Sequence, residues 1–271
     1  MTRGERDAPG RRARMTVGEP DAPDLHPLAG GGHVAYRFLP GRAPTVVFLC
    51  GYASEMTGTK ARFLHRVCAD AGHAYLRFDY RGRGASSGRF EEGTIGSWTD
   101  DACAVIEAAV RGPVVLVGSS MGGWIMLLVA RRLSGRVRAL VGVAAAPDFT
   151  EDGLWTRMSD SERHELATRG VLHVPSRYSD EPYPVTLRLV EDARERLQLR
   201  DRIPLDCPVR LIHGYRDEDV PWQTSFRLAS RLRSSDVKVE IVGDGEHRLS
   251  RDADLARLAR TLHGVLGARG T

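Results

Sequence analysis

The feature that most constrains this chain is a serine flanked by glycines and placed between two apolar stretches. The sequence Gly-Ser-Ser-Met-Gly at residues 118–122 follows apolar residues 114–117 and precedes the largely apolar residues 123–128. This order predicts a strand, a sharp turn and a helix, a setting in which G-x-S-x-G is typical of a nucleophile elbow. Glycines two positions on either side of Ser120 avoid the Cβ atoms that would block so tight a turn. A motif centred on Ser119 lacks the first glycine, so we expect Ser120 to be the nucleophile. The pentapeptide alone leaves open a glycine-rich turn with an inert serine.

Bulk composition excludes several classes of protein. A chain of 271 residues with 42% hydrophobic residues is long enough for one large α/β domain or two small ones. No run approaches the roughly 18 apolar residues of a membrane-spanning helix, so we expect no membrane span. The net charge is only +4, and no basic stripe with interleaved aromatic residues is present. We therefore expect no nucleic-acid partner; the oligomeric state stays open.

The cysteines and the N-terminus bear on the compartment. The four cysteines are widely spaced and form no CxxC pair, so we expect neither a metal site nor disulfides. The N-terminus lacks the apolar core of a signal peptide. Its arginine-rich start resembles an organelle transit peptide, but five acidic residues among the first 24 argue against that interpretation. We therefore expect a cytoplasmic protein whose residues 1–24 form a disordered tail rich in Pro, Gly and charge.

Strand-like and helix-like patterns alternate from His33 onward. Apolar runs predict strands at residues 34–38, 45–49, 74–78, 114–117, 137–144, 209–212 and 237–242. Helical patterns cover residues 60–71, 95–110 and 252–266, and a further helix follows the elbow. Continuous apolar strands that alternate with helices predict a mainly parallel central sheet with helices on both faces.

One segment interrupts this alternation. Residues 147–208 hold helical pieces and several prolines, and structureless loops of that length are uncommon in compact domains. We expect a small helical cap inserted into an α/β core made of residues 25–146 and 209–271. Apolar side chains of the cap suggest a wall for an acyl group; an equal alternative is that they only dock the cap onto the core. The candidate substrate-binding residues are Trp155, Met158, Tyr178 and Tyr183.

A serine nucleophile needs a base and an acid. His247 is the candidate base, because it lies in the loop between the last strand and the last helix, at the sheet edge expected to hold the elbow. Asp217 is the candidate acid, because it follows the preceding strand and gives the chain order Ser, Asp, His. Glu218 and Asp219 are close competitors, and Asp148 is a weaker one.

The oxyanion of a tetrahedral intermediate also needs donors. One should be the backbone N–H of Met121, directly after the nucleophile and at the start of a helix. The second should come from the loop after the strand at residues 45–49, where Tyr52 is the candidate. The adjacent Gly51 would let that backbone approach the site.

Together these residues resemble the α/β-hydrolase family. Finer similarity runs through residues 51–60, 77–80, 117–124, 175–179 and 207–222. These segments are similar to one branch of the family, which contains a mammalian acyl-protein thioesterase that also cleaves acyl glucuronides, together with its bacterial relatives. The resemblance covers residues 45–250 and implies a serine hydrolase of thioesters and esters, with Ser120, Asp217 and His247 as nucleophile, acid and base. One departure is Glu246, since relatives often have Asp before the histidine.

We therefore expect hydrolysis of a small-molecule or acyl-protein ester or thioester through an acyl-enzyme. This chemistry requires no cofactor and no metal. Two alternatives stay open from the sequence: a non-catalytic α/β-hydrolase fold that binds a ligand or partner, and an acyltransferase that uses the same residues.

Overall fold

A computed structural model describes residues 22–177 and 181–267 of the chain. The expected disordered tail comprises residues 1–24. Its residues 1–21 lie outside the described part of the chain. The chain enters the first strand, β1, at Asp24 (Asp24–Pro27). This strand was not predicted, because four residues that include a histidine and a proline carry little apolar periodicity.

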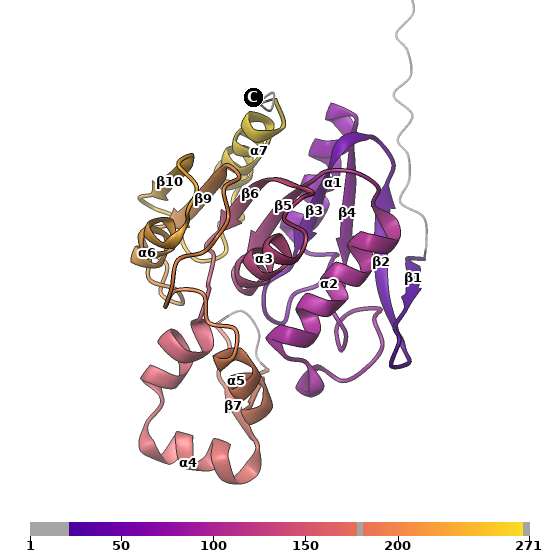
Figure 1. Ribbon diagram of the computed structural model, residues 1–271. Coiled ribbons are helices and arrows are strands. Elements are labelled where there is room, and N and C mark those ends of the chain that lie inside the picture. Colours follow the sequence, from indigo (N-terminus) through magenta and orange to yellow (C-terminus); the bar gives the residue numbers. More distant parts are fainter. Residues whose placement is uncertain (1–21, 178–180, 268–271) are drawn as a thin grey trace, which may run out of the picture.

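A central sheet of eight strands organises the molecule (Figure 1). Its order is β1-β2-β4-β3-β5-β6-β9-β10. Besides β1, the strands are β2 (His33–Leu39), β3 (Arg42–Leu49), β4 (His73–Phe78), β5 (Val114–Ser119), β6 (Val137–Val143), β9 (Val209–Gly214) and β10 (Val237–Val242). Strand β2 runs antiparallel to β1 and to β4, and the remaining neighbours are parallel. The predicted α/β fold with a mainly parallel sheet is confirmed.

Helices cover both faces of this sheet because its central strands are apolar along their whole length. All six residues of β4 and of β5 are buried. On one face α1 (Thr59–Ala71) contacts α7 (Asp252–Gly267), and on the other α2 (Ile95–Ala109) contacts α3 (Met121–Arg132) (Figure 1). A further helix, α6 (Gln223–Arg231), packs against β9 and β10. It was not predicted because its sequence is largely polar.

The segment between β6 and β9 projects from one end of the sheet (Figure 1). It holds a π-helical turn η2 (Phe149–Trp155), α4 (Asp160–Arg169) and α5 (Leu187–Arg194). It also holds an antiparallel pair, β7 (Val171–Val174) and β8 (Tyr183–Thr186), which the sequence did not predict. Each of these strands is only four residues long, and Pro184 lies inside the second. A separate hydrophobic cluster lies within this segment, formed by Met158, Leu166, Leu172, Val185 and Val190.

Two smaller observations complete the fold. A short 3-10 helix, η1 (Phe90–Glu92), precedes α2. Among residues 22–177 and 181–267, no helix has both the length and the apolar character needed to cross a bilayer.

Candidate active site

The turn at Ser120 has the strained backbone that the motif predicts. Strand β5 ends at Ser119, Ser120 adopts φ +54° and ψ −122°, and α3 begins at the next residue. A Cβ on Gly118 would lie 2.4 Å from the carbonyl oxygen of Gly122, and one on Gly122 would lie 2.0 Å from the carbonyl oxygen of Leu49. Both distances are shorter than atoms tolerate, so this turn requires glycine at both positions.

Three side chains from distant parts of the sequence form one hydrogen-bonded chain. Ser120 Oγ lies 2.9 Å from His247 Nε2, and His247 Nδ1 lies 2.8 Å from Asp217 Oδ2. The residues follow β5, β10 and β9, whose carboxyl ends meet at the same edge of the sheet. The His247 side chain is 14% exposed and the Asp217 side chain is fully buried. The imidazole thus lies between a hydroxyl and a carboxylate.

The Asp217 carboxylate is held by four donors. Its Oδ1 accepts the backbone N–H groups of Asp219 at 3.0 Å and Val220 at 2.8 Å. Its Oδ2 accepts from His247 and lies 3.0 Å from Nε2 of the buried His213, whose Nδ1 lies 2.7 Å from Ser225 Oγ. Burial raises the pKa of Asp217, but the hydrogen bonds from His213 and His247 outweigh it and hold the pKa well below its usual range. The carboxylate is therefore ionised at neutral pH.

Sequence reasoning missed the contact of His213 with the acid. The four-residue spacing between His213 and Asp217 was the available signal. It does not reveal whether the imidazole turns toward the carboxylate, because that depends on the fold of the loop between them.

The competing carboxylates lie elsewhere or have other partners. Glu218 is exposed and forms an ion pair with Arg177, and Asp219 lies 3.8 Å from the same guanidinium. Asp148 is buried and accepts backbone N–H groups of Gln198 at 2.7 Å and Leu199 at 2.9 Å. Asp148 thus fastens η2 to the chain that follows α5.

The loop after β3 passes directly over the elbow. A Cβ on Gly51 would lie 3.3 Å from the carbonyl oxygen of Ser119 and 3.4 Å from Ser120 Cβ, so the backbone at Gly51 approaches closely. Within the described part of the chain, the backbone N–H groups of Tyr52 and Met121 donate to no protein acceptor. Two free donors beside the serine are what a developing oxyanion needs.

The Tyr52 side chain joins this loop to the inserted segment. Its hydroxyl donates to the carbonyl oxygen of Pro184 in β8 at 2.5 Å. Its ring meets those of Phe90, Phe149 and Tyr183 edge to face, with centroids 4.9, 5.9 and 5.6 Å away. Burial raises the pKa of Tyr52, so the phenol keeps its proton and remains a donor.

The four candidate substrate-binding residues lie in different places. Met158 is buried in the hydrophobic cluster of the inserted segment, and Trp155 packs against that cluster. The guanidinium of Arg194 lies 4.5 Å from the Trp155 ring centroid. Tyr183 lies against Tyr52, and Tyr178 lies outside the described residues. Substrate binding by this group stays a prediction.

Three potential metal ligands converge here. Ligand atoms of Asp217, Asp219 and His247 lie within 4.8 Å of one another. Both ring nitrogens of His247 and both oxygens of Asp217 already have partners within the chain. A metal would have to displace these hydrogen bonds, so the arrangement fits proton transfer better than metal coordination.

Known proteins resemble the chain over nearly its whole length. A human protein named palmitoyl-protein thioesterase ABHD10, mitochondrial, is 38% identical over 270 residues, which cover 99% of this chain and 86% of the relative. The structure of alpha/beta hydrolase domain-containing protein 10 from mouse superposes with a TM-score of 0.85 at 35% identity, covering 91% of this chain and 98% of the mouse chain. A structure from Agrobacterium vitis S4 gives a TM-score of 0.86 at 38% identity, covering 90% and 98%.

These relatives correct the expected location. The Bos taurus, Homo sapiens and Pongo abelii proteins are all named mitochondrial, which contradicts the cytoplasmic prediction. That prediction rested partly on cysteine usage. Widely spaced cysteines do not distinguish one reducing compartment from another.

A family model supplies the broadest comparison. The model described as the alpha/beta hydrolase family matches residues 46–261, which include the elbow, the loop of Asp217 and the loop of His247. With the relatives above, this match shows that the chain belongs to the alpha/beta hydrolase family and is a hydrolase.

Proposed function

We propose that the chain hydrolyses carboxylic thioesters and esters through an acyl-enzyme, with Ser120, His247 and Asp217 as a catalytic triad. One observation carries this proposal: the continuous hydrogen-bonded chain from Ser120 Oγ through His247 to Asp217, with links of 2.9 and 2.8 Å. A serine hydroxyl becomes a useful nucleophile only when a base accepts its proton during the attack. Within residues 22–177 and 181–267, His247 is the imidazole that lies within hydrogen-bond distance of Ser120 Oγ at this strained turn.

The reaction then has two halves. Ser120 Oγ attacks the carbonyl carbon while His247 Nε2 accepts the hydroxyl proton, which gives a tetrahedral oxyanion. His247 returns that proton to the leaving thiol or alcohol as the carbonyl re-forms. In the second half His247 Nε2 accepts a proton from a water that attacks the acyl-Ser120 ester, and it returns this proton to Ser120 Oγ as the freed acid leaves. Asp217 stays ionised throughout and stabilises the imidazolium.

The oxyanion would be bound by two backbone amides. The N–H groups of Met121 and Tyr52 have no protein acceptor in the described structure, and Gly51 allows its backbone to approach Ser120 closely. The N-terminus of α3 starts at Met121 and adds its partial positive charge. Donors fixed before the reaction cost little reorganisation when charge develops.

For the substrate we propose an acyl-protein or small acyl thioester. The relatives named palmitoyl-protein thioesterase support this class. We further propose that residues 147–208 act as a cap, because they carry a hydrophobic cluster of their own and contact the oxyanion loop through Tyr52 and Pro184. The hydroxyl nucleophile itself does not distinguish a thiol from an alcohol leaving group, so the cap would set the preference.

The decisive test combines active-site labelling with turnover. A fluorophosphonate probe should label the wild type on Ser120, and Ser120→Ala should lose labelling and nearly all hydrolysis of acyl thioesters of graded chain length. Ser119→Ala is the matched control, because it removes the same hydroxyl one residue away and should retain activity. Circular dichroism checks that each variant is folded.

Three results would contradict the proposal in distinguishable ways. An unlabelled wild type would indicate a non-catalytic binder. Full activity in Ser120→Ala would remove the nucleophile assignment. Preferential formation of esters when an alcohol is added, in place of the free acid, would indicate acyl transfer.

A further inference from the structure

The loop after β3 is strained next to the proposed oxyanion donor. Ala53 directly follows Tyr52 and adopts φ +54°, a conformation that residues other than glycine rarely adopt. The turn is closed by the N–H of Ser54, which donates to the carbonyl oxygen of Gly51 at 3.1 Å. Strained backbone of this kind persists only where the surrounding contacts hold it. The position of the Tyr52 amide therefore depends on what holds Ala53.

One side chain from a different loop holds the strained residue. Arg83 lies in the glycine-rich segment between β4 and η1, and its Nη2 donates to the carbonyl oxygen of Ala53 at 2.7 Å. The same nitrogen lies 3.5 Å from Glu55 Oε1, two residues further along the loop after β3. The guanidinium carbon lies 5.1 Å from the ring centroid of Phe90, whose ring meets the Tyr52 ring at 4.9 Å. Arg83 thus contacts this loop directly at two residues and a third through Phe90.

The segment that carries Arg83 is itself fastened to the loop after β3. Gly84, the next residue, has φ +50°, and a Cβ on it would lie 2.1 Å from Asp79 Oδ2. The Asp79 carboxylate accepts the backbone N–H groups of Ala85 at 3.0 Å and of Met56 at 2.6 Å. One buried carboxylate thus bonds both backbones, so the Arg83 side chain starts from a fixed point beside the loop that it contacts.

We propose that Arg83 is a positioning residue for the oxyanion-binding amide of Tyr52. This role rests on the proposed function, because it assumes acyl chemistry at Ser120. By holding the carbonyl of Ala53, Arg83 stabilises the strained turn in the conformation in which Gly51 packs on the elbow. An oxyanion donor must be fixed before charge develops, so a small displacement of this amide slows the chemical step more than it weakens substrate binding.

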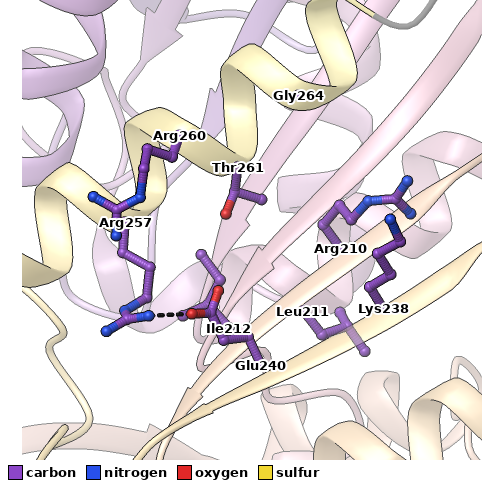
Figure 2. A pocket seen from close by; sticks show the side chains of 9 residues that line it. All are labelled: Arg210, Leu211, Ile212, Lys238, Glu240, Arg257, Arg260, Thr261 and Gly264. Carbon is purple, nitrogen blue, oxygen red and sulfur yellow. Dashed lines mark hydrogen bonds and ion pairs between the residues drawn. The ribbon is translucent and has the colours of Figure 1, made fainter.

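A second arginine offers a matched control. Arg257 of α7 pairs with Glu240 of β10 beside a cavity whose lining includes none of the three triad residues (Figure 2). Its side chain is 29% exposed, against 27% for Arg83, and each arginine pairs with one glutamate. In both, Nε is buried without a hydrogen-bond partner in the described part of the chain. Of the two, only Arg83 donates to a backbone carbonyl among the described residues.

Steady-state kinetics on an acyl thioester, with inhibition by an acyl trifluoromethyl ketone, tests this role. The ketone forms a tetrahedral adduct with a serine nucleophile, and its oxyanion needs the same donors as the reaction does. Arg83→Met keeps apolar packing on Phe90; it should lower kcat about ten- to a hundredfold, change KM less than about threefold and weaken inhibition about as much as kcat falls. Arg83→Lys keeps one cationic donor and should recover most of kcat. Arg257→Met should keep wild-type kcat and inhibition, whatever its thermal midpoint.

Several outcomes would overturn the positioning role and leave the chemistry at Ser120 intact. These are wild-type kcat and inhibition in Arg83→Met, a raised KM with unchanged kcat, and equal losses of kcat in Arg83→Met and Arg257→Met. An Arg83→Lys variant as slow as Arg83→Met would also contradict it. Failure of the proposed function gives a different result, because the wild type itself would then neither hydrolyse the thioester nor bind the ketone, and both proposals would fall.

Discussion

At the scale of single residues, the site depends on a strained serine and a tightly held carboxylate. Ser120 lies at φ +54°, a conformation that residues other than glycine rarely adopt. It persists because Gly118 and Gly122 leave space on both sides of it. Asp217 receives four hydrogen bonds, two from backbone amides and two from imidazoles, so its position and its ionisation are fixed before any substrate binds.

The residue-scale prediction concerns the acid. Asp217→Asn should lower kcat by about 10³–10⁴-fold with little change in fold, because an amide favours the wrong tautomer of His247 and does not stabilise its charged form. Steady-state kinetics on a thioester substrate measures this. Asp219→Asn makes the same chemical change two residues away and should cost only a few-fold. If Asp219→Asn were the damaging substitution, the acid would be Asp219.

At the scale of elements, the loop after β3 connects the elbow to the inserted segment. Gly51 packs on the elbow while the Tyr52 hydroxyl bonds Pro184 of β8. The Tyr52 ring is enclosed by aromatic side chains from η1, η2 and β8. The backbone amide proposed for the oxyanion is therefore positioned partly by the segment proposed as the cap.

Tyr52→Phe tests this connection by removing one hydroxyl and keeping the ring. We expect kcat/KM to fall by roughly three- to tenfold, since a single hydrogen bond contributes about 1 kcal/mol. The loss should be largest for long acyl chains, which would contact the cap most. Comparison of kcat and KM over substrates of graded length measures both effects.

The matched control is Tyr75→Phe, whose hydroxyl donates to the carbonyl oxygen of Ala61 at 2.9 Å in the core. It deletes the same group from a buried tyrosine of β4 whose hydroxyl bonds α1. It should lower stability without changing chain-length preference. An identical kinetic profile in both variants would show that the Tyr52 hydroxyl plays no part in positioning.

At the scale of the whole molecule, one partly buried cation links the two halves of the core. Lys60, at the start of α1, donates to the carbonyl oxygen of Arg248 and to Ser250 Oγ, directly after His247. Burial, together with the neighbouring Arg248, lowers the pKa of Lys60 to about 8. The loop that carries His247 is thus anchored to a helix nearly 190 residues earlier in the sequence.

The lowered pKa of this amine gives a prediction for global stability. Between about pH 8 and 10.5 the unfolded chain keeps the Lys60 proton while the folded chain has lost it. The unfolded state then binds more protons, so the free energy of unfolding gains a rising contribution with pH across this window. We expect this contribution to be about 3 kcal/mol, at about 1.4 kcal/mol for each unit by which the pKa is lowered.

Denaturant unfolding at several pH values, compared between the wild type and Lys60→Met, isolates the contribution. All other titrating groups are shared, so the difference between the two curves should rise by that amount between pH 8 and 10.5. Parallel curves would mean that Lys60 titrates in the fold as it does in the unfolded chain.

The sequence by itself determined the alternation of strands and helices, the two glycines of the elbow and the order of the three candidate side chains. These follow from local steric demands and from apolar periodicity, which neighbouring residues carry. Strand β10, for example, spans the predicted residues 237–242. The short strands β1, β7 and β8 were missed because four residues hold too little of that pattern.

Only the tertiary structure decided what those side chains contact. In the folded chain Asp217 Oδ2 contacts His247, and His213 is a second imidazole on the same carboxylate. It also bonded the Tyr52 hydroxyl to Pro184 of the inserted segment. These contacts join residues far apart in the chain, so they depend on how strands are ordered in the sheet and on side-chain directions that no local pattern specifies.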